Sequence, residues 1–174
     1  MQIITEILKI VLPSALIIYA MYLIVATFFK KSLVEKQIDL RRGSIETTLP
    51  IRLQAYERIC LLLERISPNN LIIRLNDSSL RAIEFQQLLL KEIRDEFNHN
   101  LSQQIYMSHE AWERVRAAQQ DVGTLINQAA AEISADGSAM DLARKIFEKL
   151  IQENRNPTTE ALQFVKAEIQ QEFM

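Results

Sequence analysis

The residues with the clearest chemical potential are the two histidines, His99 and His109. Glu96 precedes His99 by three positions, which is the carboxylate–histidine spacing of di-iron helical bundles. Such sites also need a second pair of this kind and two further glutamates, and the sequence has no second pair. Glu110 adjoins His109, but adjacent residues on a helix point apart. We therefore predict no metal site and no cofactor, with a metal or acid–base site near Glu96 and His99 as the alternative.

The chain also lacks the common signatures of nucleophilic and nucleotide-binding sites. It contains no Gly-x-Ser-x-Gly elbow, no glycine-rich phosphate loop and no His-Glu-x-x-His motif. The lone cysteine, Cys60, lies among leucines, where a thiol is most often a small buried hydrophobe. One cysteine forms neither a disulfide nor a zinc cluster within a single chain. We therefore predict that the protein is not an enzyme, and no small-molecule substrate is evident.

A charge pattern is the remaining candidate for a functional surface. A Glu-Arg pair occurs twice, seven residues apart: Glu57 with Arg58, and Glu64 with Arg65. None of the four has an opposite charge three or four residues away, so their partners must come from another helix, another chain or lipid. A solvated rim of weak surface ion pairs is the simpler interpretation. The alternative is that these four residues form an interaction face for another subunit.

The N-terminal part of the chain contains an uncharged apolar run at residues 10–29, which is followed by Lys30 and Lys31. At about 1.5 Å per residue it makes a helix of about 30 Å, which matches the hydrocarbon thickness of a bilayer. The run is longer than the apolar part of a secretory signal and does not end in a small-residue cleavage site. The sequence therefore predicts a single transmembrane helix that is not removed, with the lipid bilayer as its first partner.

The charges that flank this run predict its orientation. Only Lys9 lies on the upstream side, whereas five bases follow the run: Lys30, Lys31, Lys36, Arg41 and Arg42. Because cytoplasmic flanks are enriched in lysine and arginine, we expect residues 1–9 outside and the C-terminal bulk in the cytoplasm. Attraction to anionic lipid is enough to explain the basic cluster. The predicted location is therefore the inner (cytoplasmic) membrane, in a single pass.

Composition indicates a helical protein without a general nucleic-acid role. The 174 residues include 22 acids and 20 bases, for a net charge of −2, whereas nucleic-acid-binding domains usually carry a marked basic excess. Three glycines and four prolines are too few for the turns of a β-sandwich. The fold class we predict is all-α. A nucleic-acid tether, acting through the arginine-rich helix expected near residues 51–66, is a second alternative.

Apolar periodicity divides the predicted cytoplasmic part into a short connection and a bundle. Residues 30–48 read as a basic juxtamembrane helix and linker, because Gly43 resembles a helix C-cap and the residue before Pro50 should avoid helical angles. Residues 49–174 read as a bundle of about five helices. Their expected ranges are near 51–66, 79–97, 108–133, 138–152 and 156–173, with a stop at 67–70. Tyr56 lies on the apolar stripe of the first range, and helix caps are expected at Ser108, at Ser138 with Asp141, and at Asn156.

Three segments resemble a family of uncharacterised bacterial proteins of this size. They lie at residues 49–58, 62–71 and 96–106 and read LPIRLQAYER, LLERISPNNL and EFNHNLSQQIY. The resemblance covers nearly the whole chain and implies an N-terminal span with a helical cytoplasmic part, but it brings no activity. The predicted function is thus a non-enzymatic, membrane-anchored adaptor or accessory subunit that binds other subunits or itself.

Overall fold

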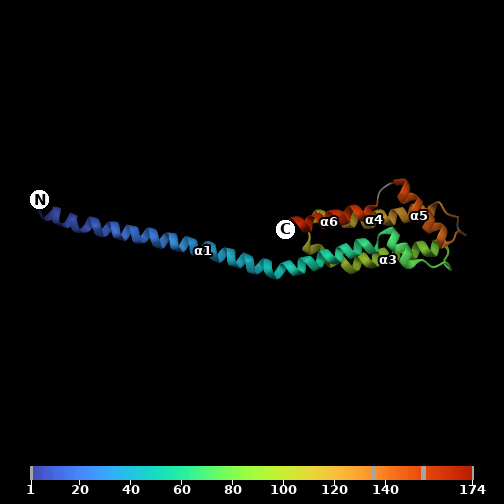
Figure 1. Cartoon of the computed structure of the whole chain (residues 1–174), viewed down its shortest axis with the longest axis horizontal. Helices are drawn as coiled ribbons and strands as arrows, with labels where there is room; N and C mark the ends of the chain where they lie inside the picture. Colours follow the sequence, from blue (N-terminus) through green and yellow to red (C-terminus); the bar gives the residue numbers. More distant parts are fainter. Residues whose placement is uncertain (1, 135, 154–155, 174) are drawn as a thin grey trace. The chain divides into compact units, whose positions relative to one another are not determined.

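The computed structural model of the chain is all-α, as the composition predicts (Figure 1). It describes the backbone of residues 2–134, 136–153 and 156–173; within these, the side chains of residues 2–15, 17, 33–35, 37–45, 172 and 173 lie outside the description. The elements follow in the order α1 (Gln2–Arg65), α2 (Pro68–Leu75), α3 (Ala82–Asn100), the 3-10 helix η1 (Leu101–Tyr106), α4 (His109–Ala131), α5 (Ala139–Glu153) and α6 (Pro157–Phe173).

The chain forms two compact units, Met1–Leu49 and Pro50–Met174, and the boundary falls inside α1. Helical backbone runs through residues 43–50, where the sequence predicts a C-cap at Gly43 and a break before Pro50. That predicted break is wrong. A proline inside a helix costs about 3 kcal/mol and a glycine about 1 kcal/mol, which are local penalties rather than prohibitions. The helix resumes packing directly afterwards, because Ala55 and Tyr56 are each only 1% exposed.

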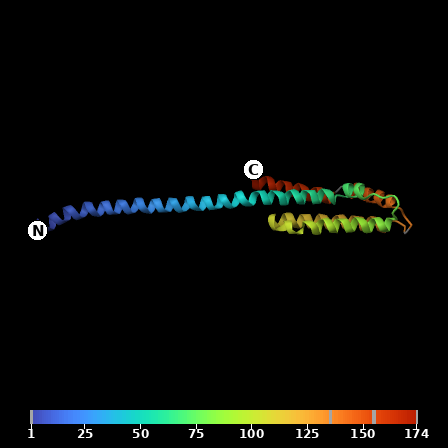
Figure 2. The ribbon, with the colours of Figure 1, turned by 90° about the horizontal axis from the view of Figure 1, so that it is seen from below.

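The core of the second unit is built from the apolar stripes of all its helices. The last part of α1 turns one stripe inward, and α4 packs against both α3 and α6 while α3 also packs against α5. Figure 2 shows the end of α1 beside α6, in agreement with a side-chain contact between these helices. The largest fully buried side chains are Tyr56, Ile59, Leu62, Leu63, Ile66, Leu71, Phe85, Leu89, Ile93, Ile126, Leu142 and Ile146.

Several helix starts are fixed by the caps that the sequence predicts. The Ser108 hydroxyl accepts a hydrogen bond of 3.0 Å from a backbone N–H in the first turn of α4. Ser138 and Asp141 form a reciprocal capping box at α5, with backbone-to-side-chain bonds of 3.1 and 3.2 Å. The Asn156 side chain accepts a 3.2 Å bond from the N–H of Thr158 at α6. These local bonds satisfy donors that a helix N-terminus otherwise leaves unpaired.

Two elements differ from the prediction. The stop at residues 67–70 ends α1 as expected, but Pro68 also begins the short helix α2, which buries Leu71 and Ile72. Proline favours the first position of a helix, because the N–H it lacks would have no partner there. Helix α3 begins three residues later than predicted because Arg81 and Glu84 form its capping box.

The predicted transmembrane helix at residues 10–29 belongs to the first unit. The side chains of residues 10–15 and 17 lie outside the described residues. Where side chains are described, no helix is both long enough and apolar enough to cross a membrane.

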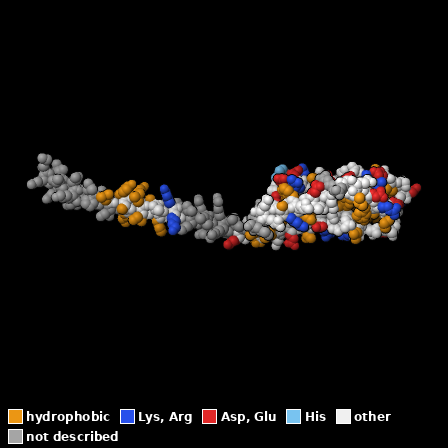
Figure 3. Space-filling model, turned by 45° about the horizontal axis from the view of Figure 1, so that its top comes forward, with side chains coloured by type: hydrophobic (Ala, Val, Ile, Leu, Met, Phe, Trp, Pro, Cys, Tyr) orange, Lys and Arg blue, Asp and Glu red, His pale blue; other side chains and the backbone are white. Residues whose placement is uncertain are grey.

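The described side chains between residues 16 and 29 of the first unit are mostly large, apolar and exposed. Figure 3 shows them in orange, followed along the helix by lysines in blue. Their exposed fractions range from 43% at Val25 to 70% at Ile24. The set comprises Leu16, Ile18, Tyr19, Met21, Tyr22, Leu23, Ile24, Val25, Phe28 and Phe29.

Candidate functional site

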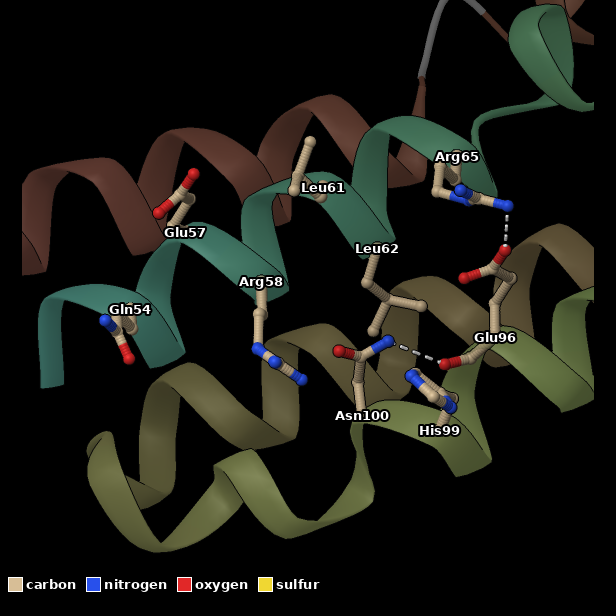
Figure 4. Close-up of a pocket in the computed structure, with 9 residues that line it drawn as sticks. All are labelled: Gln54, Glu57, Arg58, Leu61, Leu62, Arg65, Glu96, His99 and Asn100. Atoms are coloured by element: carbon tan, nitrogen blue, oxygen red, sulfur yellow. Dashed lines mark hydrogen bonds and ion pairs between the residues drawn. The ribbon is translucent and has the colours of Figure 1, made fainter. Parts of the chain in front are cut away.

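One groove in the second unit collects the two sets of residues that the sequence singled out separately. It runs between α1 and α3 and has a volume of about 560 Å³ (Figure 4). An adjoining hollow shares Arg65, Glu96 and His99 with it and adds Glu92 and Asp95. The groove is lined by Gln54, Glu57, Arg58, Leu61, Leu62, Arg65, Glu96, His99 and Asn100. Glu64, the fourth residue of the predicted interaction face, is exposed but does not line it.

The two faces of α1 explain why these side chains meet. Residues 54, 58, 61 and 65 follow one another at three- and four-residue steps and so share one side of the helix. The opposite side is buried, with Ile59 and Leu63 both fully inaccessible to solvent. Leu62 forms an apolar floor at 1% exposure, whereas Leu61 remains 54% exposed beside the charged residues. Packing of the buried stripe therefore turns the polar stripe toward the groove.

An ion pair closes one end of the groove. Nη2 of Arg65 lies 2.5 Å from Oε1 of Glu96, and the two side chains are 52% and 15% exposed. Arg65 thus finds its partner on another helix of the same chain, which is one of the alternatives that the charge pattern left open.

The other end of the groove holds Arg58 opposite the last residues of α3. Figure 4 shows the Arg58 side chain directed toward Asn100, while Glu57 points away from α3. Asn100 is 6% exposed, and its side-chain N–H donates a 2.9 Å bond to the backbone oxygen of Glu96. Among the described residues, Arg58 has no carboxylate within ion-pair distance.

The acids around the adjoining hollow are all compensated by bases. Each of the three carboxylates there has a cationic partner at 2.5 to 2.7 Å: Glu92 with Arg74, Asp95 with Lys91, and Glu96 with Arg65. Arg58 therefore presents a positive charge toward α3 that has no acidic partner in the described part of the chain.

The predicted absence of a metal site stays a prediction. His99 and Glu96 do line the groove, but within the residues that the structure describes no three His, Cys, Asp or Glu side chains are placed to hold an ion. His109 is the exposed first residue of α4 and does not line the groove. Burial raises the pKa of the Cys60 thiol, so this group is a weaker nucleophile than an ordinary cysteine.

A second polar cluster, which we name the Glu168 clasp, joins α1, α4 and α6. The Glu168 carboxylate accepts hydrogen bonds from the hydroxyls of Tyr56 and Ser108 and a 3.2 Å bond from the Ser108 N–H. Nearby, Nε of Arg52 donates a 3.1 Å bond to the Tyr106 backbone oxygen. Sequence reasoning found the Ser108 cap and the buried Tyr56 but missed Glu168, since nothing local indicates a contact across 112 positions.

The electrostatics of the clasp indicate a structural role. Burial acts to raise the pKa of the Glu168 carboxyl, but hydrogen bonds from Ser108 and Tyr56, together with the charge of Arg52, outweigh it. The pKa of Glu168 therefore lies below its usual range, and the group is ionised near neutral pH. A carboxylate in this state binds donors well but cannot deliver a proton, so the clasp holds helices together rather than serving as a general acid.

Comparison with known proteins identifies a family. The chain belongs to the family of unknown function DUF7935, whose model matches residues 2–172. Neither the curated proteins nor the solved structures contain a significant match to the chain. The predicted membership of an uncharacterised family is thereby confirmed, and the activity must be argued from the molecule itself.

Proposed function

We propose that this DUF7935 protein is a non-enzymatic membrane-anchored adaptor. In this proposal residues 10–29 span the inner membrane once, residues 1–9 lie outside, and the helical bundle faces the cytoplasm and binds another protein. The observation that carries the proposal is the set of exposed apolar side chains between Leu16 and Phe29, each at least 43% exposed.

Such a surface needs an apolar environment. Contiguous exposed apolar patches beyond a few hundred Å² mark protein or membrane contacts, and a helix that is apolar on every side suits lipid. The uncharged run in the sequence supports a spanning rather than a surface position, because its length matches the bilayer. Lys30 and Lys31 follow at once, where their side chains can reach lipid headgroups, and both are exposed.

The groove between α1 and α3 supports an adaptor more than an enzyme. Catalytic and cofactor pockets are usually concave and mostly apolar with a few converging polar groups. Here most of the lining residues are polar, Glu96 is paired with Arg65, and Asn100 bonds to backbone. These are features of a protein-binding surface with an apolar centre at Leu61 and a charged rim.

The anchoring is tested by extraction of the full chain from membranes. We expect the protein to stay in the pellet after a carbonate wash, and a fluorescent reporter fused after residue 174 to fluoresce while a periplasmic phosphatase fused there stays inactive. Ile18→Arg combined with Ile24→Arg should release it, because arginine at the centre of a span costs about 2.5–3.5 kcal/mol.

The matched control is Ile151→Arg, since Ile151 is equally apolar and 78% exposed but lies in α5. This variant should remain in the membrane fraction. A wild-type chain that carbonate removes, or an active phosphatase fusion, would overturn the proposed anchoring or its orientation.

A further inference from the structure

We propose that the groove between α1 and α3 binds an acidic amphipathic helix of a partner protein, with a partner carboxylate on Arg58 and a partner apolar side chain on Leu61. The proposal rests on the adaptor function proposed above and specifies the chemistry of the partner.

The unpartnered charge directed at α3 favours an acidic ligand. The carboxylates of the adjoining hollow are compensated by Arg65, Arg74 and Lys91, whereas Arg58 has no acidic partner among the described residues. Glu57 also lines the groove, but its side chain points away from α3, whereas that of Arg58 points toward the end of α3. A guanidinium presents a planar set of N–H donors that matches a carboxylate in two parallel hydrogen bonds.

A second donor and an apolar side chain line the groove together with Arg58. His99 lines the same groove, is exposed, and carries at least one ring N–H in either neutral form. Leu61 is 54% exposed, one helical turn beyond Arg58 on the same side of α1. A ligand that satisfies both therefore carries an acid and an apolar residue about one turn apart.

The dimensions favour a helix over a small anion. At about 1.5 Å per residue, the groove side of α1 from Gln54 to Arg65 extends over about 16 Å, or three helical turns. Amphipathic helices bind such grooves through residues spaced three, four and seven apart. A free phosphate would use Arg58 but would leave Leu61 exposed.

The test uses photo-crosslinking of the full-length protein in its native membranes. A benzophenone amino acid replaces Leu61, and the crosslinked partner peptide is identified by mass spectrometry. We expect a protein segment with an aspartate or glutamate within one helical turn of the crosslinked residue. Arg58→Glu should reduce the crosslink yield at least about tenfold, and Arg58→Gln should also reduce it, since both remove the cation.

Two controls make the result specific. Arg94→Glu introduces the same charge change at an exposed arginine of α3 that does not line the groove, and its yield should match the wild type. Changing the mapped partner acid to arginine should abolish the crosslink with wild-type Arg58 and restore it with Arg58→Glu. Unchanged circular dichroism melting of each variant shows that the bundle still folds.

Several outcomes would overturn the proposal: no crosslink at Leu61, a crosslink to lipid or nucleic acid, a segment without an acid, or an equal yield in Arg58→Glu. Its failure is distinguishable from failure of the proposed function. Crosslinks to protein from exposed Ile105, with none from Leu61, would keep the adaptor and exclude this groove. Release by carbonate with an Arg58-dependent crosslink at Leu61 would keep the groove and exclude the anchor.

Discussion

Removing the carboxylate of the Glu168 clasp should destabilise the bundle by about 2 to 3 kcal/mol. Glu168→Ala deletes three hydrogen bonds to an ionised acceptor, and one of them comes from the hydroxyl of Tyr56, whose residue is 1% exposed. A hydrogen bond to a charged group contributes about 1.5–3 kcal/mol. The remainder comes from the weakened start of α4 at Ser108, and it is discounted because Glu168 is only partly buried.

A double-mutant cycle separates the clasp from general damage to α6. Tyr56→Phe alone should cost about 1 kcal/mol, because Glu168 keeps its bonds to Ser108. In the Glu168→Ala background the same change should cost almost nothing, since the bond between the hydroxyl and Glu168 is already absent. The expected coupling between the two positions is therefore about 1 kcal/mol.

The assay is urea unfolding of the full chain in a mild detergent, followed by tryptophan fluorescence. Trp112 is the sole tryptophan, is 8% exposed and stacks on Phe97 with ring centroids 5.3 Å apart, so its emission reports the bundle core. Gln163→Ala, at an exposed position of α6, is the matched control and should change the free energy of unfolding by at most about 0.5 kcal/mol. Equal losses from Tyr56→Phe in both backgrounds would refute the reasoning.

The same assay gives a pH test of the clasp. Because the folded-state pKa of Glu168 is lowered, its contribution is fully present above the ordinary carboxyl pKa of 4.5. The contribution disappears as the pH falls through the lowered folded-state value. The unfolding free energies of the wild type and Glu168→Gln should therefore converge in acid, and a difference that stays constant with pH would exclude the electrostatic explanation.

Two further predictions use the same unfolding assay. Gly123→Ala should stabilise α4 by about 0.5–1 kcal/mol, because an added Cβ would lie at an ordinary contact distance of 3.8 Å from Cδ2 of Leu90. Gly137→Ala should destabilise the bundle by about 1–3 kcal/mol, because its Cβ would lie only 2.3 Å from Cγ2 of Ile133. A stabilising Gly137→Ala with a destabilising Gly123→Ala would contradict this packing. Hydrogen bonds from two lysines of α5 lower the pKa of Glu132 from 4.5 to about 2, so Glu132→Gln should lower the unfolding midpoint at neutral pH and lose its effect as the pH falls through about 2.

Local signals in the sequence were sufficient to predict most of the second unit. The caps at Ser108, Ser138 and Asn156 depend on residues within one helical turn, and the structure contains all three. The apolar stripes of α4, α5 and α6 likewise follow from three- and four-residue spacing. The start of α2 at Pro68 was missed because a proline that follows one helix can mark either the end of that helix or the first residue of the next one.

Contacts between helices that are distant in the sequence could not be predicted from local signals. Glu168 is one polar residue among several in α6, and only the approach of α1 gives it Tyr56 as a donor. The break expected at Gly43 and Pro50 was wrong for a different reason. Gly43 and Pro50 each lower the stability of a helix locally. The helix nevertheless continues beyond Pro50, because the following turns of α1 pack into the core, and this packing cannot be read from the two residues alone.

The duplicated Glu-Arg pattern shows how tertiary structure gives identical motifs different roles. Arg65 pairs with Glu96, and Arg58, seven residues earlier, lies opposite Asn100, because α1 and α3 run antiparallel. Helix α3 ends at Asn100, and no later turn supplies an acid there. The C-terminus of α3 carries a partial negative charge, which is worth about 0.3–1 kcal/mol to a nearby cation. This charge favours Arg58 at a position where the described residues offer it no carboxylate. One arginine thereby joins α1 to α3, and in the interaction proposed above the other binds a carboxylate from outside the chain.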